Sequence, residues 1–308
     1  RAGTFSIWGL GLIDRNKEKP QDRSEWETMA DRQSGKDELE KMSGGLVHKY
    51  SVNEDTYIRS SLSATYSRDH TVVDDKQVPV ADIRNSRWDL IFNSYLNMKF
   101  SPRHINRTGV TITQLNYDLD YQVSRYFGLN RPMEQISKGN GKSTAISAYS
   151  SSVINLNNNL TTSLGVTAQY FTLNNNFSIE PRVALKWKIN PKQSLALAYG
   201  RHSRREKLDY YYVEKVVNGK KLSNRYLDLS RAHHFGLTYD WNINQNLHLK
   251  VEPYFQYLFH VPVEEKSSFS VINYEEFYLD RILVNTGKGR NYGIDITLEQ
   301  YMKNGFYY

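Results

Sequence analysis

A short basic and tyrosine-rich segment carries the side chains best suited to binding. Guanidinium and ammonium groups bind anionic oxygen atoms through charge-assisted hydrogen bonds, and tyrosine rings add a stacking surface. The segment contains Arg201, His202, Arg204, Arg205, Lys207, Tyr210, Tyr211 and Tyr212. Two interpretations stay open: the segment contacts an anionic ligand, or it is a basic loop that meets lipid phosphates or only solvent.

The other chemical motifs do not support catalysis, a cofactor or a metal. "GNGKST" at 139–144 ends like a phosphate-binding loop, but Ile136 occupies the position where that motif needs Gly. "GKGRNYG" at 287–293 lacks the GxGxxG spacing and predicts a loop that returns into a strand. Neither GxSxG nor HExxH occurs, and the adjacent His233 and His234 would point to opposite faces of a strand. The sequence therefore predicts no enzyme, no cofactor and no metal site.

Strands with two different faces are predicted to position these residues. Ile179, Val183, Leu185, Trp187 and Ile189 alternate with Glu180, Arg182, Lys186 and Lys188. Successive strand side chains point to opposite faces, so one face is apolar and the other charged. A Lys or Arg that faces lipid near the membrane midplane costs about 2–4 kcal/mol, so the charged set must face water.

The same alternation recurs along almost the whole chain. We count about twelve runs, many of about 10 to 14 residues, and no helical periodicity competes with them. Tight turns such as "NPKQ" at 190–193 alternate with long polar loops. The predicted long loops lie near 14–43, 67–87, 128–142, 203–230 and 261–290. Short turns on one side and long loops on the other are typical of outer-membrane barrels, whereas soluble sandwiches mostly have shorter strands.

Composition excludes several classes of protein. The chain has 308 residues, 39% of them hydrophobic, and a net charge of +7. It has no Cys, which excludes disulfides and thiolate metal sites. No apolar stretch approaches the roughly 18 residues of a transmembrane helix. The positive charge alone does not predict nucleic-acid binding, because Lys and Arg are dispersed and no recognition motif accompanies them.

Several segments resemble a known family. These are "GTFSIWGLGLIDRN", "HKYSVNEDTYIRSSLSATYS", "EPR…KW…PKQSL…AYG" within 180–206 and "GKGRNYGI…LE" within 287–299. They resemble the barrel portion of TonB-dependent outer-membrane receptors, in the branch that carries a carboxypeptidase-regulatory-like domain. The resemblance covers essentially the whole chain.

The resemblance implies an all-β fold, an antiparallel transmembrane β-barrel segment with about 12–13 strands of a barrel of roughly 22. Residues 1–308 would be an internal part of one outer-membrane barrel domain, with the plug, signal peptide and C-terminal strands outside this chain. The parent protein would import a scarce, unidentified ligand across the outer membrane of a Gram-negative bacterium, using energy from the TonB complex. Its expected partners are outer-membrane lipid and lipopolysaccharide, the plug and TonB, and no nucleic acid.

Within such a barrel, the polar residues at alternate positions of each predicted strand are expected to face the lumen and contact the plug. In the run 113–126 this places Asp118 and Asp120 inside and Tyr117 outside, toward lipid. The predicted lumen-facing residues are Asp89, Asn93, Asp118, Asp120, Glu180, Arg182, Lys186 and Lys188. The alternatives are a passive porin-like channel and a soluble β-rich adhesin or binding module.

Overall fold

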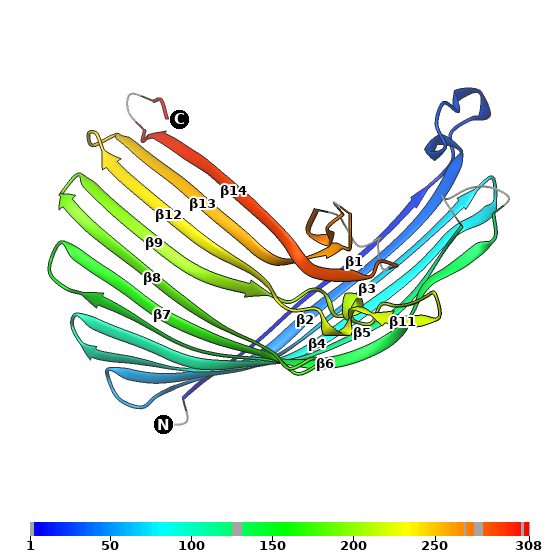
Figure 1. Cartoon of the computed structure of the whole chain (residues 1–308). Helices are drawn as coiled ribbons and strands as arrows, with labels where there is room; N and C mark the ends of the chain where they lie inside the picture. The colour runs from blue at the N-terminus through cyan, green and yellow to red at the C-terminus, as the bar shows by residue number, and fades with distance from the viewer. Residues whose placement is uncertain (1–2, 125–130, 268, 274–279, 303–304, 308) are drawn as a thin grey trace.

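The chain forms one large, curved antiparallel sheet (Figure 1). The computed structural model describes residues 3–124, 131–267, 269–273, 280–302 and 305–307. Within them the sheet has 12 strands, nearly all joined to their neighbours in sequence. The strands are β1 (Thr4–Glu18), β2 (Gln33–Ser51), β3 (Thr56–Asp75), β4 (Val78–Ser101), β5 (His104–Ser124), β6 (Met133–Asn155), β7 (Leu160–Phe171), β8 (Asn176–Asn190), β9 (Gln193–Arg204), β12 (Ser230–Asn242), β13 (Leu247–Glu264) and β14 (Leu283–Gln300). This confirms the predicted segment of a larger antiparallel barrel, and the sheet does not close on itself.

The short elements lie in the connections. Between β9 and β12 the chain forms a helical turn, a small hairpin and a 3-10 turn: α1 (Leu208–Tyr211), β10 (Glu214–Val217), β11 (Lys220–Ser223) and η4 (Asn224–Tyr226). Further 3-10 turns are η1 (Arg23–Glu25), η2 (Ala30–Arg32) and η5 (Val271–Asn273). In the part of the chain that the structure describes, no helix is long and apolar enough to cross a membrane.

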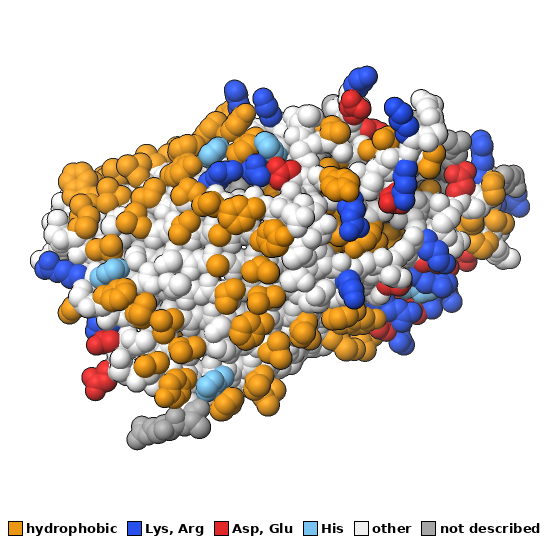
Figure 2. All heavy atoms as spheres, turned by 60° about the horizontal axis from the view of Figure 1, so that its bottom comes forward, with side chains coloured by type: hydrophobic (Ala, Val, Ile, Leu, Met, Phe, Trp, Pro, Cys, Tyr) orange, Lys and Arg blue, Asp and Glu red, His pale blue; other side chains and the backbone are white. Residues whose placement is uncertain are grey.

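The two faces of the sheet differ in chemistry because residues opposite each other in an antiparallel register share a face. One face carries Leu90, Leu185, Trp187, Phe255 and Ile294, all large and exposed. Figure 2 shows hydrophobic side chains over most of the convex side, with the charged ones gathered mainly toward one end. We call this the outer face, and the concave face, which is mostly polar, the inner face.

The loop predicted at 67–87 is wrong, most of the described part of 128–142 is strand, and of 14–43 only residues 19–32 lie between β1 and β2. Residues 67–87 are not a loop, because β3 and β4 continue to a two-residue turn at Lys76 and Gln77. Both turn residues have positive φ, 51° and 67°, as the hairpin turns that match strand twist require. The loops predicted at 203–230 and 261–290 are confirmed as the connections between β9 and β12 and between β13 and β14. Of 128–142, residues 128–130 lie outside the described residues and most of the rest is in β6.

The core lies on the inner face, at the end of the sheet where the β9–β12 connection folds inward. Tyr117 and Leu119 of β5 are 6% and 4% exposed, and Leu208 and Tyr211 of α1 are 7% and 0% exposed. They belong to one cluster of buried side chains. Toward the Ser124 end of β5, the apolar side chains therefore face inward, where α1 covers them.

Candidate functional site

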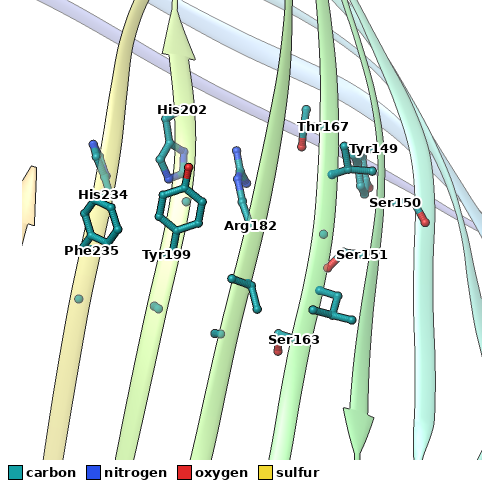
Figure 3. Close-up of a pocket in the computed structure, with 18 of the residues that line it drawn as sticks. Tyr149, Ser150, Ser151, Ser163, Thr167, Arg182, Tyr199, His202, His234 and Phe235 are labelled. Atoms are coloured by element: carbon teal, nitrogen blue, oxygen red, sulfur yellow. The ribbon is translucent and has the colours of Figure 1, made fainter. Parts of the chain in front are cut away.

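A hollow lined mainly by inner-face residues crosses β6 to β9, β12 and β13. Its volume is about 860 Å³, and its lining includes Arg182, His202, His234 and Gln256. Figure 3 shows Arg182, His202 and His234 on three neighbouring strands, β8, β9 and β12. The rings of His202 and His234 are 4.6 Å apart between centroids. The hollow therefore offers a cation and several hydrogen-bonding groups to a solute that carries oxygen atoms.

A buried carboxylate supports this wall. The side chain of Glu180 is 1% exposed, and one oxygen accepts hydrogen bonds from Gln169 Nε2 (2.6 Å) and the Ser203 backbone N–H (3.0 Å). The Ser203 hydroxyl donates to the same oxygen. The other oxygen accepts from Arg182 Nη2 at 3.1 Å. Glu180 thus joins β7, β8 and β9 and fixes the guanidinium of Arg182 beside the hollow.

The connection 205–229 is anchored to the inner wall by a second buried carboxylate. Arg87 Nη2 donates to Asp209 Oδ2 at 2.6 Å, and the Asp209 side chain is 1% exposed. The ring of Tyr212 packs against Tyr117, with 5.3 Å between centroids. The Tyr212 hydroxyl donates to the carbonyl oxygen of Lys142 at 3.1 Å. The start of the connection therefore rests on β4, β5 and β6 instead of projecting into solvent.

Two further contacts hold the rest of the connection. The ring of Tyr211 lies 5.1 Å from that of Phe171, and its hydroxyl accepts a hydrogen bond from the Glu206 backbone N–H at 3.2 Å. Burial raises the pKa of Tyr211 well above its usual range, so it remains neutral. Asn224 donates to the carbonyl oxygen of Arg281 and accepts from the Leu283 backbone N–H, both at 2.8 Å.

A second cavity, of about 450 Å³, lies where the connection leaves β9. Its lining includes Thr113, Gln169, Arg204, Arg205 and Lys207. The basic side chains of the β9–β12 connection therefore lie next to the inner wall, close to the larger hollow through the shared Gln169.

The predicted lumen-facing residues do not all share one face. The register places Asp89, Asn93, Glu180, Arg182, Lys186 and Lys188 on the inner face. Asp118 and Asp120 lie on the outer face, opposite Ser86 and Arg84. Their prediction as inward-facing is contradicted because this end of β5 is covered inside by α1 and is polar outside.

The basic, tyrosine-rich segment does not form one contact surface. β9 extends to Arg204, so its residues alternate: His202 faces inward and Arg201 outward, with Cζ 6.0 Å from the Phe259 ring centroid. Arg204 shares the inner face with His202, and Arg205 and Lys207 line the second cavity. Tyr210 and Tyr211 are 5% and 0% exposed, so they cannot touch a ligand while buried in this way.

Sequence reasoning missed some of the residues that shape the site. His234 and Gln256 face the hollow, and the ion pair of Arg87 with Asp209 joins residues 122 positions apart. The alternation of β12 and β13 could have placed the first two, whereas no local signal reveals the ion pair. Across the described residues, no three His, Asp or Glu side chains are arranged to hold a metal ion.

Comparison with known proteins agrees with this architecture. Residues 7–308 match the model of the TonB dependent receptor-like β-barrel family. No curated protein sequence matches the chain. Among solved structures, the outer membrane transporter YddB from Escherichia coli is similar, with a TM-score of 0.66 and 11% identity over 96% of this chain and 43% of that one.

Two further structures show the same fold. The FrpB iron transporter from Neisseria meningitidis has a TM-score of 0.65 and 10% identity over 97% of this chain and 48% of its own. The ferric-catecholate import receptor Fiu from E. coli K12 has a TM-score of 0.62 and 8% identity over 98% of this chain and 54% of its own. The chain thus spans about half the length of these structures. Because the family model matches nearly all of it, this chain belongs to the TonB-dependent receptor β-barrels of the Gram-negative outer membrane.

Proposed function

We propose that this chain forms part of the barrel of a TonB-dependent importer that moves a scarce ligand across the outer membrane. The observation that supports it most directly is a polar inner wall with a hollow of about 860 Å³, on a sheet of this family. Since the chain spans about half of the similar structures, we take residues 1–308 as an internal part of one barrel domain. The parent protein would supply the plug, the signal peptide and the C-terminal strands.

The inward-facing residues have two roles in this proposal. Asp89, Asn93, Lys186 and Lys188 hydrate the lumen and contact the plug, because charged side chains on the inner wall keep their hydration there. On its way inward the ligand contacts Arg182 beside the hollow. At the second cavity it contacts Arg204, Arg205 and Lys207. The chain does no chemistry of its own. The outer face contacts membrane lipid and lipopolysaccharide.

The two alternatives fit the geometry less well. A soluble adhesin would pack its apolar faces against each other, but Leu185, Trp187 and Ile294 remain 38%, 48% and 58% exposed on the outer face. A passive channel is disfavoured by the match of residues 7–308 to the TonB dependent receptor-like β-barrel family.

Energy-dependent uptake is the decisive test. Cells that carry the parent gene would be given radiolabelled ferric catecholate, copper(II) or peptides, and accumulation would be compared with that of a deletion strain. We expect one probe to accumulate only with the gene present, and accumulation to stop when the inner-membrane proton gradient is collapsed. Uptake that persists without the gradient would instead indicate a passive channel.

A matched pair of variants tests the inner wall in the same assay. Arg182→Gln removes the cation at the hollow, and Lys288→Gln removes a cation from the outer face. We expect the first change to reduce uptake by about ten- to a hundredfold and the second to have no effect on it, because a lost charge-assisted hydrogen bond costs about 1.5–3 kcal/mol. Equal uptake by both variants would remove Arg182 from the ligand path.

A further inference from the structure

Three cations lie close together on the inner face, toward the short turns that join β2 to β3 and β4 to β5. The register places Lys49 directly opposite Arg59. Asn97 lies between Tyr57 and Arg107 in the neighbouring row of the sheet. Short turns face the periplasm in outer-membrane barrels, so these side chains lie in the periplasmic half of the lumen. We call Lys49, Arg59 and Arg107 the inner basic patch.

Tyrosine rings hold two of these cations in place. Lys49 Nζ lies 4.6 Å from the ring centroid of Tyr57, and Arg107 Cζ lies 4.7 Å from that of Tyr95. The two rings meet edge to face, with 6.2 Å between their centroids. Cation–π contacts of this kind restrict the motion of long side chains. Binding of a ligand therefore costs less side-chain freedom here than at unrestrained cations.

The wall of the barrel does not neutralise the inner basic patch. Among the described residues, no Asp or Glu lies within ion-pair distance of Lys49, Arg59 or Arg107. On β13, in the same half of the inner face, the cation is paired, because Lys250 Nζ lies 2.6 Å from Glu252 Oε2. The inner basic patch therefore keeps a positive potential that attracts anions from the lumen.

The inner basic patch continues into the hollow beside Arg182. Arg107 lies opposite Ser151, Ser151 opposite Gly165, and Gly165 opposite Arg182. Three strand spacings of about 4.8 Å place the two arginines about 14 Å apart along the wall. Ser151 and Gly165 line the hollow, and their small size leaves the space between the two guanidinium groups open. Figure 3 shows Tyr149 and Arg182 on this wall, on either side of β7. One ligand can therefore contact the hollow and the inner basic patch together.

We propose that the inner basic patch and Arg182 form an oxyanion subsite, which takes a ligand with at least two carboxylate or phosphate groups. Guanidinium groups bind such groups through paired N–H donors. The proposal rests on the import function proposed above, and it names the charge class of the imported ligand. A solute is favoured over an acidic face of the plug, because the patch is continuous with a hollow that also offers His202, His234 and Gln256.

The test measures the local charge at the patch in the full-length parent protein. Asn97→Cys places a thiol in the inner basic patch, and Thr238→Cys places one on the inner face of β12 beside Glu252. Each thiol would be treated with two methanethiosulfonate reagents, one bearing a sulfonate and the other a trimethylammonium group. Mass spectrometry of the modified peptides would give the rate of each reaction.

Two triple variants provide the matched comparison. The inner variant carries Lys49→Gln, Arg59→Gln and Arg107→Gln, which together remove the inner basic patch. The outer variant carries Arg68→Gln, Arg84→Gln and Lys138→Gln, which remove the same charge from the outer face. A heat-shift gel would show that both variants are folded.

We expect the ratio of the sulfonate rate to the trimethylammonium rate to be about tenfold higher, or more, at position 97 than at position 238. The inner variant should abolish this difference, and the outer variant should preserve it. Inorganic pyrophosphate should slow the sulfonate reaction at position 97 more than sodium chloride does at the same ionic strength. It should lose this effect in the inner variant.

The remaining outcomes would overturn the proposal. Equal ratios at the two positions, or pyrophosphate that acts no better than sodium chloride, would show that the patch does not bind oxyanions. A thiol at position 97 that reacts with neither reagent until the protein is denatured would show that the plug covers the patch. Gradient-dependent uptake by the same variants separates this claim from import, because uptake can persist without an anion preference at position 97, or the reverse.

Discussion

At the scale of single residues, Glu180 is the side chain whose loss should matter most. Glu180→Ala removes the acceptor for Gln169, Ser203 and Arg182 at a site that is 1% exposed. We expect the free energy of unfolding to fall by about 2–4 kcal/mol, because hydrogen bonds to a charged group are strong and their donors would stay buried. Urea unfolding of the refolded barrel in detergent micelles would measure it.

Arg182→Ala is the matched control. Its side chain is 50% exposed, and Glu180 keeps its hydrogen bonds from Gln169 and Ser203 after the change, so we expect a smaller loss, of about 1 kcal/mol. If both changes cost the same, Glu180 does not act through Gln169 and Ser203, and its role is limited to the ion pair.

The sequence predicts which face a residue lies on where every second residue of a strand is apolar. Lys186 and Lys188 were correctly placed opposite Leu185 and Trp187, because only one register keeps the lysines out of lipid. Asp118 was misplaced because Tyr117 and Leu119 look like a lipid-facing set, yet they pack against α1 from a distant part of the chain. Alternation shows that two faces differ but not which apolar face meets lipid.

At the scale of elements, the connection 205–229 should depend on the ion pair of Asp209 with Arg87. The Asp209 side chain is 1% exposed, and removing one partner leaves a charge in a site from which water is excluded. Asp209→Ala should therefore increase hydrogen exchange across 205–229 by tenfold or more, with little change in β5 and β6. Arg87→Ala should have a similar effect, and the double variant should add little to either.

An exposed ion pair in the same connection provides the comparison. Lys221 Nζ lies 2.7 Å from Glu214 Oε2, but the side chains are 65% and 48% exposed. Such a pair contributes about 0.2–1 kcal/mol, so Lys221→Ala should leave exchange in 205–229 almost unchanged. An increase as large as that of Asp209→Ala would mean that the β10–β11 hairpin holds the connection in place.

Element boundaries were predicted well where turn residues mark them and poorly elsewhere. "NPKQ" correctly marked the turn between β8 and β9. The sequence predicts a loop at 67–87 because Arg68, Asp69, Asp74 and Asp75 make this stretch polar. The stretch is polar because β3 and β4 extend beyond the roughly 9–11 residues that cross the membrane, so both of their faces can meet water or the lumen there.

At the scale of the whole molecule, the proposals depend on one property: the outer face of the sheet meets lipid and the inner face meets water. The hollow beside Arg182 can admit a ligand only from an aqueous lumen. The two faces alternate along β9, where His202 faces inward and Arg201 outward.

Cysteine labelling tests this property directly, because the chain contains no Cys. Leu185→Cys and Lys186→Cys introduce neighbouring thiols on the outer and inner faces of β8. In intact outer membranes, a small membrane-impermeant maleimide should label position 186 and leave position 185 protected, since the reagent reaches the lumen but not the acyl chains. Both should react after denaturation.

The remaining outcomes separate the competing arrangements. Protection at both positions would indicate that the plug covers Lys186, and repeating the experiment without the plug should then restore labelling at 186 only. The same pair of substitutions at Tyr117 and Asp118 should give labelling at 118, which lies on the outer face above the apolar band, and protection at 117, which lies beneath α1. Equal labelling of 185 and 186 would contradict the membrane-spanning arrangement of the sheet and both proposals with it.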